Sequence, residues 1–199
     1  MGKTINLKTD YAEAINKIQS HGILVHSAFI MGYDYDTPQA FDDLIEFIEN
    51  NRLLMPLINI LTPFPGTKLY RRFEEEDRII HKNWSEYDSE NVVFRPSLMA
   101  PEELAAEFKR VIRKVYSFDS IYEKLEHYWN IDFWNHQNRI DPVKFTLRLL
   151  FALRLFTLLF SLNVNRSKFI LKILPKVFNK RVRLSTILTL MAYNDYAFI

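Results

Sequence analysis

Two short apolar runs in the first third of the chain constrain its fold more than any other feature. They cover residues 23–30 (ILVHSAFI) and 57–61 (LINIL), and a polar loop and then a helical pattern follow each one. Short apolar runs bounded by turn residues are typical of strands buried in a parallel sheet. Because helices are predicted before, between and after the runs, the order indicates an α/β fold built from βα units.

The predicted helices rest on apolar residues that recur at spacings of three and four. They cover residues 10–21, 39–51, 68–76, 101–128, 142–162, 167–179 and 184–193. Asp10 is placed to cap the first helix and Gly22 to end it, while Thr37 is placed to cap the second, with Pro38 at its first position. A short strand is also expected at residues 91–94.

Two parallel strands cannot form an independent sheet, because their faces and edges would stay uncovered. We therefore expect the first half of the chain to be a slice of a larger α/β barrel or sheet.

Composition excludes several kinds of chemistry. The chain has no cysteine, so it cannot form disulfides, thiolate nucleophiles, zinc–thiolate sites or iron–sulfur ligation by itself. It has 4 glycines and no glycine-rich phosphate loop, and its 5 histidines are scattered without a metal-binding pair. The N-terminus lacks the apolar core of a signal peptide, which makes the cytoplasm the default expectation.

Charge divides the chain into two regions of opposite sign. Residues 139–199 carry eleven Lys and Arg against two Asp, a net charge of +9, whereas the preceding residues carry −7. The longest uncharged stretches of this basic tail, residues 155–165 and 184–194, are each shorter than the roughly 20 residues of a membrane-spanning helix. The tail is predicted either to pack its apolar face on the protein or to lie on an anionic membrane surface. It has no nucleic-acid-binding module, which disfavours nucleic acid as a partner.

Two loops are the candidate binding elements, because ligands of α/β folds bind at the carboxyl ends of strands. In the first loop, residues 32–37 (GYDYDT), Gly32 would let a ligand approach the backbone, and Asp34 and Asp36 offer carboxylates for a hydroxyl, an amine or a metal. The second loop is residues 62–67 (TPFPGT), where Phe64 would pack on a ligand or on the core. The alternative for both loops is structural: a capped turn and a rigid connector.

Residues 21–49 (HGILVHSAFIMGYDYDTPQAFDDLIEFIE) and 57–79 (LINILTPFPGTKLYRRFEEEDRI) closely resemble radical S-adenosylmethionine (SAM) proteins with a cobalamin (B12)-binding domain. Residues 81–104 (HKNWSEYDSENVVFRPSLMAPEEL) and the helical tail are similar to the C-terminal extension of one subgroup. The resemblance covers most of residues 6–128. It implies a C-terminal barrel part in residues 1–100, with about the last two units of a TIM-like (β/α) barrel, and an all-α extension in residues 101–199.

The resemblance also implies a site. In that family three cysteines hold a [4Fe–4S] cluster, SAM binds the cluster, and a radical formed from SAM attacks the substrate. The first loop would lie near SAM and the second beside the substrate. The implied cofactor-binding residues are Ile30, Met31, Gly32, Tyr33, Asp34, Thr62, Pro63 and Phe64.

The chain departs from the family pattern, because it lacks the cluster-binding cysteines. We therefore expect no cofactor in the isolated chain. An intact enzyme of this family is expected to hold SAM and an iron–sulfur cluster, and the sequence leaves open whether it also uses cobalamin. One hypothesis is a split or truncated enzyme that pairs with a cysteine-containing N-terminal half-barrel. The alternatives are a non-enzymatic protein that binds a partner or an anionic membrane surface, and a pseudogene product.

Overall fold

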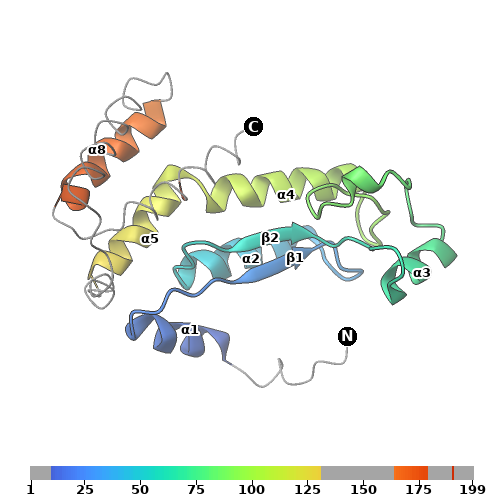
Figure 1. Cartoon of the computed structure of the whole chain (residues 1–199), viewed down its shortest axis with the longest axis horizontal. Helices are drawn as coiled ribbons and strands as arrows, with labels where there is room; N and C mark the ends of the chain where they lie inside the picture. The colour runs from blue at the N-terminus through green and yellow to red at the C-terminus, as the bar shows by residue number, and fades with distance from the viewer. Residues whose placement is uncertain (1–9, 131–163, 179–189, 191–199) are drawn as a thin grey trace. The chain divides into compact units, whose positions relative to one another are not determined.

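The structure is a computed structural model, and it describes residues 10–130, 164–178 and 190. Helices predominate, and two strands form a small parallel sheet (Figure 1), which confirms the α/β class. The predicted alternation of helices and strands is also confirmed. In chain order the elements are α1 (Tyr11–Ser20), β1 (Ala28–Met31), α2 (Pro38–Asn50), β2 (Leu57–Ile60), α3 (Lys68–Glu75), the short 3-10 helix η2 (Trp84–Glu86), α4 (Pro101–Val115), α5 (Phe118–Asn130) and α8 (Val164–Phe178).

The chain forms two compact units. The strand unit comprises residues 26–50 and 56–115 and holds β1, α2, β2, α3 and α4. The helical unit holds α1, α5 and α8, together with residues 51–55 and Leu190. The predicted division at residue 100 describes a family relationship, and it stays a prediction.

The sheet of the strand unit has two different faces. β1 and β2 pair in parallel with Ala28 opposite Leu57 and Ile30 opposite Asn59, so these four side chains share one face. Ala28, Ile30 and Leu57 are exposed there, and Asn59 is half-buried. On the other face Met31, Ile58 and Ile60 are buried, and Phe29 is half-buried.

Helices of the same unit cover the buried face. The ring of Phe29 meets that of Phe47 of α2 edge-on, with the centroids 6.1 Å apart. α2 and α4 pack against each other, and Arg110 Nη2 of α4 lies 2.8 Å from Asp42 Oδ1 of α2. The sheet is therefore one layer, with helices on one side and exposed apolar side chains on the other.

The two edges of the sheet also differ. On the outer edge of β2, the amide of Ile60 donates a 2.7 Å hydrogen bond to the carbonyl of Ser89. On the outer edge of β1, the backbone groups of Ala28 and Ile30 have no partner in the part of the chain that the structure describes. Among the described residues, the β1 edge is therefore the one that is open to a further strand.

Three sequence predictions need correction. β1 begins at Ala28 rather than at residue 23, because pairing with β2 starts only where the amide of Leu57 donates to the carbonyl of Ser27. The short strand expected at residues 91–94 is reduced to one antiparallel bridge between Ile79 and Phe94.

The third correction concerns the helix predicted over residues 101–128, which is two helices. α4 ends at Val115 and α5 begins at Phe118. Ser117 lies in the break, and its Oγ accepts a 3.2 Å hydrogen bond from the amide of Ser120. A serine that caps a helix start in this way offers the backbone an alternative to a continuous helix.

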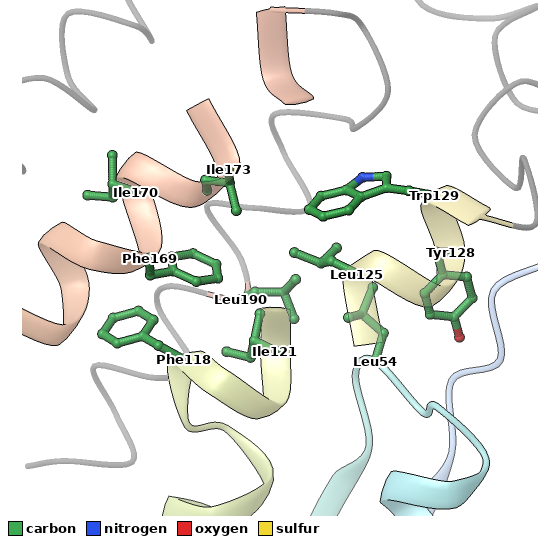
Figure 2. Close-up of a cluster of buried hydrophobic side chains, with 10 residues drawn as sticks. All are labelled: Leu54, Phe118, Ile121, Leu125, Tyr128, Trp129, Phe169, Ile170, Ile173 and Leu190. Atoms are coloured by element: carbon green, nitrogen blue, oxygen red, sulfur yellow. The ribbon is translucent and has the colours of Figure 1, made fainter. Parts of the chain in front are cut away.

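The core of the helical unit is a cluster of apolar side chains from α5, α8 and the segment before β2 (Figure 2). Its buried members are Leu54, Phe118, Ile121, Leu125, Tyr128, Trp129, Phe169, Ile170, Ile173 and Leu190. α8 confirms the helix predicted at residues 167–179, while the helix predicted at 142–162 and nearly all of that at 184–193 lie outside the described residues. α1 confirms the predicted cap, because the amide of Glu13 donates to Asp10 Oδ1 at 3.1 Å.

Candidate functional site

The two candidate loops leave the sheet at the same edge, because β1 and β2 are parallel. The amide of Leu61 donates a 2.8 Å hydrogen bond to the carbonyl of Met31, so the strands stay paired up to the point where both loops begin. The carboxyl edge of the sheet therefore carries both loops, as the sequence predicted from the strand order.

Gly32 has a structural requirement of its own. Its φ of +99° lies in the region that favours glycine, and a Cβ added there would lie 2.9 Å from Leu104 Cδ2 and 3.3 Å from Phe94 Cζ. The space beside this glycine is therefore occupied by apolar side chains of the same unit rather than left open to a ligand.

Asp36 folds the first loop back on itself. Its Oδ2 accepts hydrogen bonds from the amides of Gly32 and Tyr33, both at 2.9 Å, and its own amide donates to the carbonyl of Tyr33 at 3.0 Å. The two loop amides nearest to the strand end are thus already bonded to a carboxylate. This arrangement matches the capped turn that the sequence left open as an alternative for Asp36.

Asp34 is held by two arginines. Its Oδ2 lies 2.7 Å from Arg72 Nη2 and its Oδ1 lies 2.8 Å from Arg78 Nη1, while the hydroxyl of Ser97 donates to Oδ1 at 3.1 Å. Burial pushes the pKa of Asp34 upward, but the Arg78 hydrogen bond and charge, the Ser97 hydrogen bond and the Arg72 charge together hold it below its usual range. Asp34 is therefore a charged anchor of the loop.

Arg78 connects this anchor to the rest of the strand unit. Its side chain is only 13% exposed, and its guanidinium lies over the ring of Phe73, 4.0 Å from the centroid. Its Nε donates to the carbonyl of Arg95 at 2.7 Å, and its Nη1 also pairs with Glu76 Oε2 at 3.0 Å. The first loop is thus fastened to α3 and to the segment after it.

The second loop ends in a capped helix. The hydroxyl of Thr67 accepts from the amide of Tyr70 at 3.1 Å and donates to the carbonyl of Phe64 at 2.7 Å. The hydroxyl of the buried Thr62 donates to the carbonyl of Ile60 at 3.1 Å. The backbone of this loop is therefore set by its own hydrogen bonds, while the ring of Phe64 is 46% exposed.

The eight predicted binding residues fall into three groups by exposure. Met31, Gly32, Thr62 and Pro63 are buried, Tyr33 and Asp34 are half-buried, and Ile30 and Phe64 are exposed. The ring of Tyr33 stacks on that of the exposed Tyr35, with centroids 5.8 Å apart. Ile30, Phe64 and the tyrosine pair are therefore the groups that a ligand can reach, and the binding role of all eight stays a prediction.

Sequence reasoning missed Arg72, Arg78 and Ser97 as partners of the first loop. In the sequence, Arg72 and Arg78 are interpreted as surface charges of α3 and of the segment after it. Ser97 lies 63 residues from Asp34 along the chain. Within the described ranges no three His, Asp or Glu side chains gather to hold a metal ion. No helix in that same part of the chain is long and apolar enough to cross a membrane.

Comparison with known proteins gives two findings. A family model described as a domain of unknown function (DUF4070) matches residues 67–198. Three curated methyltransferases are similar to parts of the chain: a bacteriochlorophyllide d C-12(1)-methyltransferase from Chlorobaculum tepidum (32% identical over 126 residues), a hopanoid C-2 methylase from Rhodopseudomonas palustris (30% over 127) and a bacteriochlorophyllide d C-8(2)-methyltransferase from C. tepidum (27% over 97). No solved structure matches.

The matched segments cover 63%, 64% and 49% of this chain but only 27%, 23% and 22% of the three relatives, in the same order. The chain thus spans about a quarter of the length of the curated proteins that it matches. The matches confirm the resemblance to the C-terminal part of radical SAM proteins of the cobalamin-binding type.

Proposed function

We propose, from the premise that this chain belongs to the DUF4070 family, that it forms the C-terminal part of a radical SAM methyltransferase of the cobalamin-binding type. The strands β1 and β2 with helices α2 and α3 would supply the last βα units of a partial barrel, and residues from about 101 onward would form a helical extension whose first helix, α4, packs within the strand unit. The chain would act in catalysis only together with a cysteine-bearing half-barrel.

One observation carries this proposal: the sheet has helices on one face, exposed apolar residues on the other, and one open edge. In a (β/α) barrel, helices cover the outside of the strands and the other face looks into the barrel. Ile30, Leu57 and Asn59 lie on that second face. The open edge of β1 supports the addition of preceding barrel strands there, while the bond from Ile60 to Ser89 supports β2 as the last strand.

The residues present fit SAM in part. Ile30, 45% exposed on the open face, and the rings of Tyr33 and Phe64 offer apolar and aromatic surface for an adenine or a substrate. The amides of Gly32 and Tyr33 do not fit as donors to a ligand, because both already donate to Asp36. The proposed role of Asp34, Asp36 and Arg78 is to keep the loop in one conformation beside the ligand.

The residues present do not fit the iron–sulfur cluster, since the chain has no cysteine. When bound to such a cluster, SAM supplies the radical chemistry of the family. We propose that this chain contributes shape and apolar surface to the reaction site, and that the cluster ligands come from another segment. The names of the relatives and the apolar open face favour methylation of a large, mostly apolar molecule.

The first test is genetic and biochemical. The DNA directly upstream of this coding sequence is expected to encode a CxxxCxxC motif. The two coding segments, expressed together and supplied with iron and sulfide, are expected to consume SAM, whereas either product alone does not. Absence of such a frame, or equal SAM consumption without this chain, would contradict the proposal.

A pair of variants tests the open face itself. Ile30→Asp places a charge where the ligand is proposed to lie, and it is expected to lower SAM consumption by the complex about tenfold or more. Ile80→Asp is the matched control, because Ile80 is 39% exposed in the same unit but belongs to neither strand of the sheet. If the two variants lower activity equally, the open face is not the site.

A further inference from the structure

A cavity lies in the helical unit, between the start of α5 and the first turns of α8. Its volume is about 320 Å³, at the lower end of the range for small-molecule sites. Its polar lining consists of Ser117, Asp119, Tyr122, Asn165, Lys168 and Lys172. None of these residues belongs to the loops of the strand unit from which the site proposed above is built.

The cavity has a cationic side. Lys168 and Lys172 are exposed and lie four residues apart on α8, so their side chains project from the same side of the helix. Neither makes an ion pair within the described ranges, and Lys172 Nζ lies 5.0 Å from the centroid of the Tyr122 ring. Two ammonium groups beside a cavity without a carboxylate bonded to them favour an anionic ligand.

The start of α5 adds a hydroxyl donor. Ser117 Oγ accepts from the amide of Ser120, and its own hydrogen has no acceptor among the described residues. Asp119 is the one acidic group in the lining and opposes an anion, which leaves the lining with a net charge of +1. The side chain of Asn165 offers a further amide donor at the rim.

The remaining wall of the cavity is apolar. The rings of Phe118 and Phe169 stack with their centroids 4.9 Å apart, and Figure 2 shows them facing each other from α5 and α8. On α8, Val164 and Leu171 are 64% and 59% exposed and lie four and three residues from Lys168 along the helix. A ligand here would meet cations at one end and aromatic or aliphatic surface at the other.

We propose that this cavity binds a phosphate ester that carries an apolar substituent. The phosphate oxygens lie between the ammonium groups of Lys168 and Lys172, and one of them accepts a hydrogen bond from the hydroxyl of Ser117. The substituent lies against Phe118 and Phe169. A soluble phosphate monoester and the headgroup region of an anionic phospholipid share this chemistry, and the experiment separates them.

The experiment titrates the full chain calorimetrically with phenyl phosphate, inorganic phosphate and monomeric dihexanoyl-phosphatidylglycerol. Phenyl phosphate or the phospholipid is expected to bind about tenfold more tightly than inorganic phosphate, because the substituent buries apolar area. Tighter binding of phenyl phosphate would identify a soluble ester as the ligand, and tighter binding of the phospholipid would identify a lipid headgroup. The proposal is overturned if neither ester saturates below about 10 mM, a dissociation constant too weak for a built site.

Charge variants test the geometry in both directions. Lys168→Ala and Lys172→Ala are each expected to weaken binding about tenfold, the size of a lost charge-assisted contact. Asp119→Asn is expected to tighten binding about threefold, because it removes the opposing charge. Lys109→Ala removes an exposed lysine of α4 outside the cavity and is expected to leave binding unchanged. Equal loss in Lys109→Ala, or weaker binding in Asp119→Asn, would overturn the proposal.

A variant that fills the cavity tests the proposal without unfolding the protein. Asn165→Trp places a large ring at the rim and keeps both lysines, and it is expected to abolish binding while the thermal midpoint of unfolding stays within about 3 °C of the parent chain. Unchanged binding in this variant would show that the lysines act outside the cavity and would sink the proposal.

Discussion

In the strand unit, the first of the two predicted binding loops is held by an ionised carboxylate, Asp34, which is bonded to two arginines and a serine. In the helical unit, the comparable buried contact is uncharged: Gln19 Nε2 donates to the hydroxyl of Tyr128, which donates to the carbonyl of Arg52. Tyr128 belongs to the buried apolar cluster of the helical unit. The two contacts therefore differ in kind, because the first holds its loop through charge and the second joins neutral groups beside a packed apolar cluster.

The largest expected effect tests volume in the helical unit. Leu125 is 0% exposed within the apolar cluster, so Leu125→Ala is expected to lower the free energy of unfolding by about 2–5 kcal/mol. Leu171→Ala, at an exposed position of α8, is expected to change it by less than about 0.5 kcal/mol. Urea titration followed by circular dichroism measures both. Equal effects would show that the cluster does not stabilise the unit through packing.

The next effect tests close packing in the strand unit, which the comparison above describes by its charged contact. Gly32→Ala and Gly66→Ala both place a side chain at positive φ, which costs about 1 kcal/mol each. Only Gly32→Ala also meets Leu104, and this overpacking adds about 1–3 kcal/mol. The difference between the two variants in urea titration isolates the clash. No difference would mean that α4 moves away from the loop without cost.

A third variant tests the charged anchor. Asp34→Asn is expected to lower the free energy of unfolding by about 1–3 kcal/mol at neutral pH, because the largely buried Arg78 loses one of its two carboxylate partners and keeps only Glu76. Asp43→Asn, an exposed carboxylate of α2, is the matched control with an expected change below about 0.5 kcal/mol.

The contribution of Asp34 to stability is expected to decrease at low pH. Because the folded-state pKa of Asp34 lies below its ordinary value of 3.8, its stabilisation is complete above that value and is lost as the pH falls through the folded pKa. Thermal unfolding scans at decreasing pH are expected to show a shallower acid loss in Asp34→Asn than in the parent chain. An unchanged slope would contradict the ionised anchor.

The smallest expected effect belongs to the helical unit. Burial, with a further contribution from the charge of Arg52, lowers the pKa of His127 below its ordinary value of 6.5. Its contribution to stability is therefore present above pH 6.5 and is lost as the pH falls below that value. The thermal midpoint of the parent chain is expected to fall between about pH 6.5 and 5, and in His127→Gln this fall is expected to be smaller by about 1–2 °C. An unchanged pH dependence in His127→Gln would contradict this contribution of His127.

The sequence predicted the elements that depend on neighbours along the chain. The cap at Asp10, the start of α2 at Pro38 and the ends of α3 follow from local hydrogen bonds and apolar spacing. The break at Ser117 was missed, because the apolar spacing of α4 continues across it and only the side-chain cap interrupts it.

The candidate site was predictable in place but not in detail. Parallel strands bring both loops to one edge whatever their side chains are. Which partners Asp34 takes depends on a path through α3 and the segment to Ser97 that no local pattern encodes. The same holds for Gly32, since the side chain of Leu104 that fills the space beside it comes from α4.

The bond between Ile60 and Ser89 has a consequence for self-association. A sheet with two open edges can add copies without limit, which is how edge-to-edge aggregation proceeds. Here one edge is occupied, so two copies that meet through β1 would form a four-stranded sheet whose outer strands are both β2. Growth would stop at that pair. The protein would therefore be protected from fibre formation through this sheet even though no strand is paired to its β1 edge.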